Sequence, residues 1–346
     1  MKTHVSLPVE QPIVTSWGNQ SHVFSIAQRH PAYKPWIYSS YIQIELIVGL
    51  SGGDTILNYS HLTTPQEDCP WIETTRTTVQ QIQESGRDLV SFFKENLLKG
   101  YYIYQFINMY YIPAYPTYQR KHAQHDPMII GFDDEQEIFY MADFHQNTDG
   151  AMRYGIFEVS YTQLTDSILH LTEELNILKG IELFQYRTDV SVPFDTERVK
   201  IALSDYLTST YTPHREPTWL STPVLAYGIA CYDHLIQHIE DIKMGSELRD
   251  FRFFHVMDDH KLLMYQRLQY MHEIGLIRAE LPQGYEEILN DAATMRNLLL
   301  KFGLNGNIRL LDRVILLLRK IVETEKNILG GLLEELKNPR PASVQA

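Results

Sequence analysis

The hydrophobic periodicity of this chain changes near Pro193. Before that point, stretches that alternate like strands are mixed with stretches of helical spacing. From Val224 to Leu336 nearly every segment has helical spacing, in four candidate helices separated by glycine or proline. We therefore predict an α+β domain with a mostly antiparallel sheet over residues 1–193, because strands joined by short turns pair that way. An all-helical domain over residues 194–338 and a disordered tail over residues 339–346 follow.

Composition excludes several classes of function. Lys+Arg 30 against Asp+Glu 43 gives a net charge of −13, which argues against a face that binds nucleic acid phosphates. No apolar run reaches membrane-spanning length, and the N-terminus lacks the features of a signal peptide. We expect a cytoplasmic protein that binds neither nucleic acid nor membrane. The two cysteines, Cys69 and Cys231, lack the spacing of a disulfide framework or a zinc site.

The first half also contains individual helix and strand signals. A helix is expected to start at Gly18 or Asn19 and to end before Pro31. Apolar residues recur every three or four positions from Thr74 to Leu98, which predicts an amphipathic helix that stops at Gly100. An alternating aromatic stretch then begins at Tyr101 and predicts a strand.

The stretch "HDPMIIGFDDEQEIFYMADF" carries the chemistry. It begins with His125, runs through two apolar strands joined by a turn, and reaches Asp143 at the end of the second strand. In a hairpin the start of the first strand lies beside the end of the second, so these two side chains are predicted to be neighbours. An imidazole beside a carboxylate is how a base is oriented in nucleophilic catalysis.

This stretch resembles the His/Asp half of papain-like cysteine enzymes, in the form found in bacteriocin-leader peptidases and in the N-terminal domain of butirosin biosynthesis protein H. In those families a histidine stands six residues before the glycine of a Gly-aromatic-Asp-Asp turn, and an aspartate ends the returning strand. His125, the turn 131–134 and Asp143 match that pattern. The resemblance covers roughly Pro8 to Tyr161. It implies a papain-like fold in which the histidine moves a proton and the aspartate orients it.

The resemblance also implies an activity, which is acyl transfer. In the family a cysteine at the start of the first long helix attacks an acyl group. For the butirosin relative the donor is a carrier-protein thioester and the acceptor is an amine, within specialised-metabolite pathways that make peptide antibiotics and nonribosomal peptides. The expected partners are therefore an acyl or peptidyl carrier protein and a small amine. Phosphopantetheine enters only as part of the carrier, and no other cofactor or metal is expected.

The sequence departs from this pattern at the nucleophile. The expected helix start, "SWGNQSHVFS", contains no cysteine. Cys69 comes some fifty residues later and precedes a proline, where a helix N-terminus would not activate a thiolate. Cys231 lies in a predicted helix, where a single cysteine is usually a packing residue. Neither cysteine is a good candidate for the missing nucleophile.

Ser21 is the candidate replacement at the helix start. A serine is a weak nucleophile at its own pKa and would depend on His125 as its base. The competing interpretation, which we favour, is that Ser21 is an early helix residue or cap. Asn19 and Gln20 could instead donate hydrogen bonds to a bound carbonyl.

Other candidates are weaker. His122 could join Asp126 or Asp143 in a metal site, but a third convincing ligand is missing, so a solvated loop histidine is the simpler interpretation. Carrier proteins are usually acidic, so a local basic patch such as the run Arg120–His122 would have to overcome the acidic balance of this chain. A homodimer through the helical half is left open.

Two functions of different classes remain. The first is an acyltransferase or condensation-type protein in which His125 acts as general base on the amine, so that the thioester is aminolysed directly. The second is a papain-like pseudoenzyme that serves as a binding or scaffold partner of the biosynthetic assembly line. A peptidase is the least favoured, because it most needs the thiolate.

Overall fold

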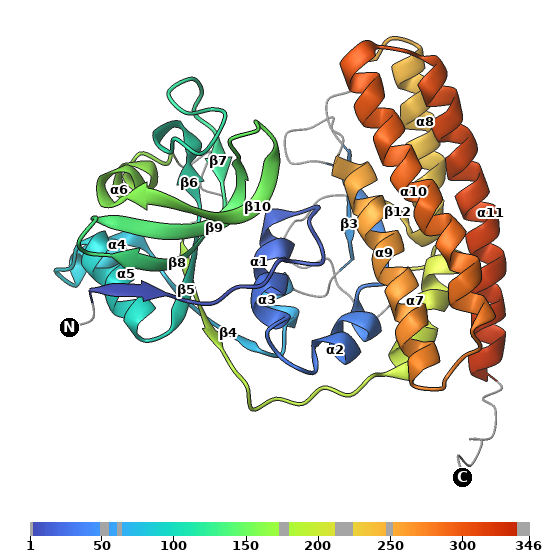
Figure 1. Cartoon of the computed structure of the whole chain (residues 1–346), viewed down its shortest axis with the longest axis horizontal. Coiled ribbons are helices and arrows are strands. Elements are labelled where there is room, and N and C mark those ends of the chain that lie inside the picture. The colour runs from blue at the N-terminus through green and yellow to red at the C-terminus, as the bar shows by residue number, and fades with distance from the viewer. Residues whose placement is uncertain are drawn as a thin grey trace. The chain divides into compact units, whose positions relative to one another are not determined.

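The computed structural model describes residues 3–48, 55–60, 64–172, 180–211, 224–246 and 252–337. The chain forms two compact units (Figure 1). Unit 1 contains Met1–Pro31 and Pro65–Ser191, and unit 2 contains Ala32–Thr64 and Val192–Ala346. Both units combine helices with antiparallel strands, so the predicted α+β class is confirmed.

Unit 1 is built on an antiparallel sheet in the order β10-β9-β8-β5-β11-β4, with β1 paired to β8. A short ribbon formed by β6 and β7 extends it. The strands are β1 (His4–Ser6), β4 (Ile72–Thr77), β5 (Tyr101–Gln105), β6 (Ile107–Asn108), β7 (Gln124–His125), β8 (Met128–Asp133), β9 (Ile138–Gln146), β10 (Met152–Ser160) and β11 (Ile181–Tyr186). The helices are α1 (Gly18–Ala27), α3 (Pro65–Asp68), α4 (Val79–Glu84), α5 (Leu89–Leu98) and α6 (Tyr161–Leu169).

The core of unit 1 lies between this sheet and the helices α5 and α6, which pack against its strands (Figure 1). Apolar side chains at helical spacing on the helices meet alternate side chains of the strands, as amphipathic elements require. The buried residues of this core include Leu89, Phe93, Leu97, Ile103, Ile129, Phe132, Phe139, Met141, Leu164 and Ile168.

The predicted hairpin is present as β8 and β9. Its register pairs Asp133 with Ile138, so the turn occupies residues 134–137 and the glycine of the motif belongs to the strand. Asp133 Oδ1 accepts hydrogen bonds from the backbone nitrogens of Glu135 and Gln136, at 2.8 and 3.2 Å. An aspartate side chain that bonds its own turn in this way holds the register of the hairpin.

The close approach of β1 explains why position 131 is a glycine. Its partner in the register is Ser6, and a Cβ at this position would lie 2.2 Å from the carbonyl oxygen of Val5. Any larger residue would push β1 away from β8. The glycine of the motif is therefore explained by close packing of two strands and not by a turn conformation.

The helix predicted from Thr74 to Leu98 is wrong in its first half. Residues up to 77 form β4, which pairs with β11. Thr78 then caps the short helix α4. Gly86, at a φ of +75°, interrupts the helical segment between α4 and α5. Asp88 caps α5, which ends before Gly100 as predicted, with a φ of +87° at that glycine. The threonines at 74–77 carry the strand signal, which the helical spacing around them masked.

Unit 2 combines a small antiparallel sheet, β12-β2-β3, with long helices (Figure 1). The strands are β2 (Ile44–Val48), β3 (Thr55–Tyr59) and β12 (Val224–Tyr227). The helices are α2 (Tyr33–Ser40), α7 (Thr196–Thr208), α8 (Cys231–Lys243), α9 (Arg252–Glu273), α10 (Glu280–Asn305) and α11 (Arg309–Lys337).

The units differ from the predicted domains in the assignment of residues 32–64, which pack with the C-terminal half. β2 pairs with β12, and the buried guanidinium of Arg267 on α9 donates to the carbonyl oxygens of Tyr38 and Tyr41, at 2.6 Å each. A buried guanidinium needs such acceptors, so these contacts fix the early segment to the helices. The later boundary of unit 1, at Ser191, lies close to the predicted one.

The expectation of an all-helical second half is wrong at β12. Val224–Tyr227 was included in a predicted helix, but it adds a strand to β2. The four helices that were predicted beyond this point are present as α8 to α11. The tail at 339–346 lies outside the described residues.

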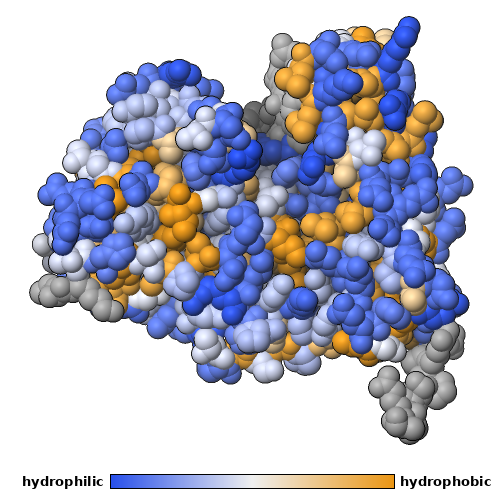
Figure 2. Space-filling view, in the orientation of Figure 1, coloured by the Kyte–Doolittle hydropathy of each residue, from blue (hydrophilic) through white to orange (hydrophobic). Residues whose placement is uncertain are grey.

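Several apolar side chains of unit 2 are exposed. Leu300, Leu304, Ile308 and Leu316 lie on or next to α10 and α11, and Leu304 is 89% exposed. Figure 2 shows hydrophobic atoms gathered at the end where these two helices are joined. Among the described residues, no helix is long and apolar enough to span a bilayer.

Candidate active site

The hairpin brings His125 and Asp143 together, as the sequence predicted. His125 is the last residue of β7, in the short ribbon with β6. Asp143 lies on β9, next to the pair formed by Met128 and Ala142. The Nδ1 atom of His125 lies 3.1 Å from Oδ2 of Asp143. The carboxylate is fully buried, whereas the imidazole is 24% exposed. The pair therefore combines a buried orienting group with a base that is open to solvent on one side.

The contacts of His125 are compatible with either neutral tautomer of its imidazole. Its Nδ1 also lies 2.9 Å from the backbone nitrogen of Asp126, so it accepts that hydrogen bond when the proton is on Nε2. When the proton is on Nδ1, the ring donates to Asp143 and Nε2 becomes the basic nitrogen. A buried carboxylate favours the second arrangement, because it stabilises a donor that faces it.

Tyr115 contacts both members of the pair. Its hydroxyl donates to Oδ2 of Asp143 at 2.5 Å, and its ring stacks on His125 with 5.3 Å between centroids. Burial raises the pKa of Tyr115 well above its usual range, and the Asp143 charge raises it further. The hydroxyl therefore stays protonated and remains a donor. No sequence pattern pointed to this residue among the many tyrosines around it.

The other oxygen of Asp143 is different. Oδ1 is buried and has no hydrogen-bond partner in the described part of the chain. Nε2 of His22 lies 3.9 Å from this oxygen, which is too far for a hydrogen bond. A buried carboxylate oxygen without a donor costs about 1–3 kcal/mol. Such an unsatisfied group in a native fold requires an explanation other than stability.

His22 supports the same cluster from α1. Nothing in the sequence distinguished this residue beyond its place on a predicted helix. Its Nε2 lies 2.8 Å from the carbonyl oxygen of Asp126, and its Nδ1 lies 3.0 Å from the hydroxyl of Tyr154. Burial lowers the pKa of His22, and this outweighs the opposing effect of the carboxylates of Asp143 and Asp126. A neutral His22 donates from Nε2 and so fixes the backbone next to His125.

Asp126, which follows β7 in the chain, completes the cluster and lies against the start of α1. Its Oδ2 accepts from the hydroxyl of Tyr104 at 2.7 Å, and its Oδ1 lies 3.3 Å from Nδ1 of His125. Burial acts to raise the pKa of Asp126, but His125, His22 and Tyr104 together hold it below its usual value. This carboxylate is therefore charged at neutral pH.

The start of α1 is the position where the resemblance implies a cysteine, and a glycine begins the helix here. A Cβ at Gly18 would lie 3.2 Å from Oδ1 of Asp126. The carboxylate of Asp126 thus lies against the helix N-terminus, where the helix dipole favours a negative charge.

Ser21, the candidate replacement for the nucleophile, does not join this cluster. Its side chain is fully buried, and its hydroxyl lies 3.0 and 2.9 Å from the carbonyl oxygens of Val14 and Trp17. The hydroxyl proton is therefore held by the backbone and is not presented to His125. Of the neighbours proposed as carbonyl donors, Gln20 is buried, and the backbone nitrogen of Gln20 donates to Oδ1 of Asn19 at 2.8 Å.

Neither cysteine can supply a thiolate. Cys69 and Cys231 are both free and buried. Burial raises the pKa of Cys69 to about 12 and that of Cys231 well above its usual value. Their assignment as packing residues agrees with this burial.

His122 lies outside the cluster. Its ring stacks on Tyr110, with 4.3 Å between centroids, and its Nδ1 lies 2.9 Å from Nδ2 of Asn108. Within the described ranges, no group of three or more histidine, cysteine, aspartate or glutamate side chains is arranged to hold a metal ion.

Comparison with known proteins adds no family to this geometry. No protein-family model matches the chain, and no curated protein is significantly similar to it in sequence.

Proposed function

We propose that unit 1 is an acyltransferase that joins an amine to an acyl group delivered as a thioester. His125 is the general base, and Asp143 orients it. The observation that carries the proposal is the 3.1 Å contact between Nδ1 of His125 and the buried carboxylate of Asp143. Tyr115, which donates to the same oxygen, limits the carboxylate to one orientation.

The reaction needs no enzyme nucleophile. The amine nitrogen attacks the thioester carbonyl carbon, and Nε2 of His125 accepts the proton that the nitrogen loses. The carbon–sulfur bond then breaks, and the imidazolium returns this proton to the departing thiolate, which gives an amide and a thiol. A positioned base of this kind contributes about 10²–10⁴ in rate.

The chain's own side chains support this route over a covalent one. The thiols of Cys69 and Cys231 are buried with raised pKa values, and Ser21 bonds the backbone. A thioester is itself an activated acyl group, so an amine with a well-placed base can attack it directly.

The identity of the substrates is proposed from the resemblance. The donor is an acyl or peptidyl carrier protein with a phosphopantetheine thioester, and the acceptor is a small amine in a cytoplasmic pathway for peptide antibiotics. The papain-like character of unit 1 is part of the same proposal. The protein supplies no cofactor of its own in this scheme.

A second candidate is a papain-like pseudoenzyme that binds or scaffolds the assembly line. The observation that favours it is the carboxylate of Asp126 at the start of α1, because a side chain at Gly18 would approach it within 3.2 Å. A negative charge there would raise the pKa of a thiol and disfavour a thiolate.

The deciding experiment measures amide formation from acyl-loaded carrier proteins and amines by mass spectrometry of the product and of the intact enzyme. The variants are His125→Ala and Ser21→Ala, with His4→Ala as the matched control. His4 is also beside an aspartate, Asp133, at 3.4 Å, but it is 55% exposed. Circular dichroism verifies that each variant is folded.

We expect His125→Ala to lower the rate by about 10²–10⁴, while the other two variants stay within about twofold of wild type. No mass is added to the enzyme. An unchanged rate in His125→Ala eliminates base catalysis. Absence of product from every donor, with carrier binding retained in all variants, establishes the pseudoenzyme instead.

A further inference from the structure

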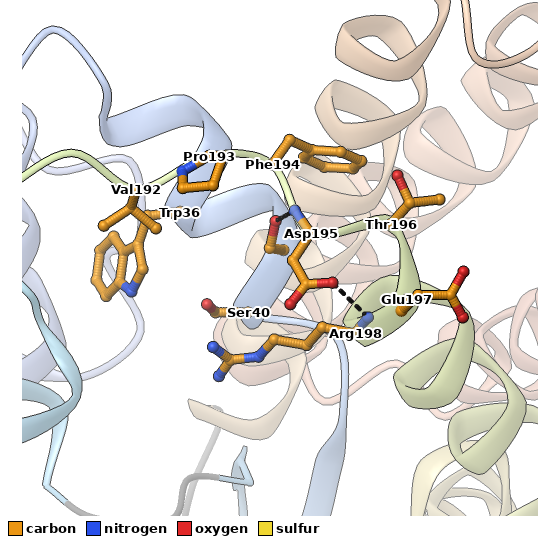
Figure 3. Close-up of a pocket in the computed structure, with 10 residues that line it drawn as sticks. Trp36, Ser40, Val192, Pro193, Phe194, Asp195, Thr196, Glu197 and Arg198 are labelled. Atoms are coloured by element: carbon orange, nitrogen blue, oxygen red, sulfur yellow. Dashed lines mark hydrogen bonds between the residues drawn. The ribbon is translucent and has the colours of Figure 1, made fainter.

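Unit 2 contains a pocket of about 330 Å³ where the segment leading into α7 passes the C-terminal end of α2 (Figure 3). Trp36 and Ser40 line it from α2, and Phe194 and Arg198 line it from the later segment. The pocket lies wholly within unit 2 and includes none of the residues of the His125 cluster. Its interpretation therefore stands apart from the proposed function.

Ser40 is the first sign that this pocket binds a ligand. The side chain is only 4% exposed, yet its hydroxyl has no hydrogen-bond partner among the residues that the structure describes. The preceding residue is fully used: Ser39 donates to the carbonyl oxygen of Pro35 at 2.7 Å and accepts from the backbone nitrogen of Asp195 at 2.8 Å. Ser39 thus joins the two walls, whereas the hydroxyl of Ser40, which also lines the pocket, has no such partner among the described residues.

Arg198 is the second sign. Within the described ranges its guanidinium makes no hydrogen bond or ion pair, although it lines the same pocket as Ser40. Figure 3 shows the side chains of Ser40 and Arg198 extending toward the same side of the view. A guanidinium is always charged and presents a planar set of donors that suits a carboxylate.

The acidic side chains at the pocket are already engaged. The carboxylate of Asp195 caps α7 and accepts from the backbone nitrogen of Arg198 at 2.9 Å. Glu197 pairs with Lys200 at 2.8 Å. Their charges still disfavour a dianion such as phosphate, because it would face two carboxylates and one guanidinium. A monoanion suits this balance.

We propose that this pocket binds a small monocarboxylic acid with an aromatic or branched apolar body. The carboxylate accepts hydrogen bonds from Arg198 and from the hydroxyl of Ser40. The body packs against the apolar wall formed by Trp36, Val192 and Pro193, which is suited to a planar or branched group (Figure 3).

The test is isothermal titration calorimetry on the full chain with phenylacetate, benzoate and 3-methylbutanoate as probes. Phenylacetamide has nearly the same shape as phenylacetate but no charge, and it serves as the matched ligand. Arg198→Gln and Ser40→Ala remove the two donors. Lys200→Gln removes a cation that lies two residues further along α7 and is not among the pocket-lining residues.

We expect at least one of the acids to bind with a millimolar or lower Kd, and phenylacetamide to bind at least about tenfold more weakly than phenylacetate. Arg198→Gln weakens the acids by about tenfold or more, Ser40→Ala by about threefold to tenfold, and Lys200→Gln by less than twofold. Absence of binding by all three acids at about 10 mM overturns the proposal. Equal binding of the acid and its amide, or unchanged affinity in Arg198→Gln, also overturns it.

The stability of Ser40→Ala separates a ligand site from a structural role. Because the hydroxyl has no partner in the free protein, its removal should leave the Tm unchanged or raise it while it weakens the acids. A lowered Tm in Ser40→Ala would mean that the hydroxyl is bonded in the free protein, which removes the main support for the site.

Discussion

Units 1 and 2 each bury a carboxylate beside a basic side chain, but they satisfy these carboxylates very differently. In unit 2, Lys261 lies 2.8 Å from both oxygens of Glu325. The hydroxyls of Tyr206, Tyr232 and Tyr285 donate to the same carboxylate. All five side chains are fully buried.

The unit 2 network joins α7, α8, α9, α10 and α11, because each helix contributes one of its members. His260 extends it, with Nδ1 3.0 Å from Lys261 and Nε2 2.8 Å from the carbonyl oxygen of Ile42. Burial lowers the pKa of His260 well below its usual value, and Lys261 lowers it further. The imidazole is therefore neutral and accepts from the lysine.

In unit 1 the buried carboxylate of Asp143 is satisfied on one oxygen and unsatisfied on the other. Its basic neighbour, His125, is partly exposed. A network satisfied on every side gives uniqueness and strength to a core. A half-satisfied one lowers stability and is retained where a function depends on it. We therefore propose that the Glu325 network serves folding and that the Asp143 cluster serves function.

Asp143→Asn gives the largest expected effect. The amide keeps an oxygen for Tyr115 but removes the charge that orients the imidazole, so amide formation should fall by about 10²–10⁴. Unfolding in urea should shift by less than about 1 kcal/mol, or toward greater stability, because one oxygen already lacks a donor. Turnover and urea titration are measured on the same preparation. A loss of stability without a loss of rate would reverse the assignment of this cluster to function.

Glu325→Ala should instead act on stability. It leaves the ammonium of Lys261 buried and three tyrosine hydroxyls without their acceptor, so the free energy of unfolding should fall by about 3–5 kcal/mol. Urea titration followed by circular dichroism at 222 nm measures it. Glu287→Ala is the control, because Glu287 pairs with Lys320 on the surface and should change stability by about 1 kcal/mol or less. Similar values for the two variants would contradict the role given to the network.

The pH dependence of stability concerns both units. Burial lowers the pKa of His22 in unit 1 and of His260 in unit 2 from the ordinary value of 6.5. Below pH 6.5 these histidines bind protons in the unfolded chain but stay neutral in the folded protein. Their contribution to the free energy of unfolding is therefore fully present above pH 6.5 and is lost as the pH falls. Each histidine contributes up to about 1.36 kcal/mol per pH unit.

Urea midpoints at pH 7.5 and 5.5 measure this loss. His22→Gln and His260→Gln should each make the midpoint less dependent on pH, since glutamine keeps a donor but does not titrate. A pH dependence that neither variant reduces would mean that other groups control it.

The hairpin of the site could be predicted from the sequence, but the residues that surround the His125–Asp143 pair could not. Two apolar strands separated by a turn with an aspartate define β8 and β9. Their register pairs Met128 with Ala142, so the residues just before β8, including His125, come close to Asp143. His22 and Tyr115 reach the same carboxylate from a helix and a loop that are distant in sequence. Local patterns carry no information about such contacts, because tertiary packing decides them.

The same limit explains the errors in the fold. The amphipathic spacing of α8 to α11 was sufficient to predict these helices, since each buries one face. Val224–Tyr227 is short, and its strand character depends on pairing with β2, some 180 residues earlier. The residues that follow it are helical, so the local pattern favoured the wrong state.

His4→Ala should have the smallest effect and tests whether proximity of a histidine to an aspartate is enough. His4 Nδ1 lies 3.4 Å from Oδ2 of Asp133, a distance close to that in the buried pair, but the histidine side chain is 55% exposed. Water screens an exposed pair, so its removal should change the free energy of unfolding by about 0–1 kcal/mol and leave turnover unchanged. Urea titration and the amide assay measure both. Because His4→Ala and His125→Ala each break a His–Asp contact in the same unit, the difference between them isolates what the buried carboxylate and Tyr115 add. A loss of turnover in His4→Ala as large as in His125→Ala would show that burial of the carboxylate is not what distinguishes the two pairs.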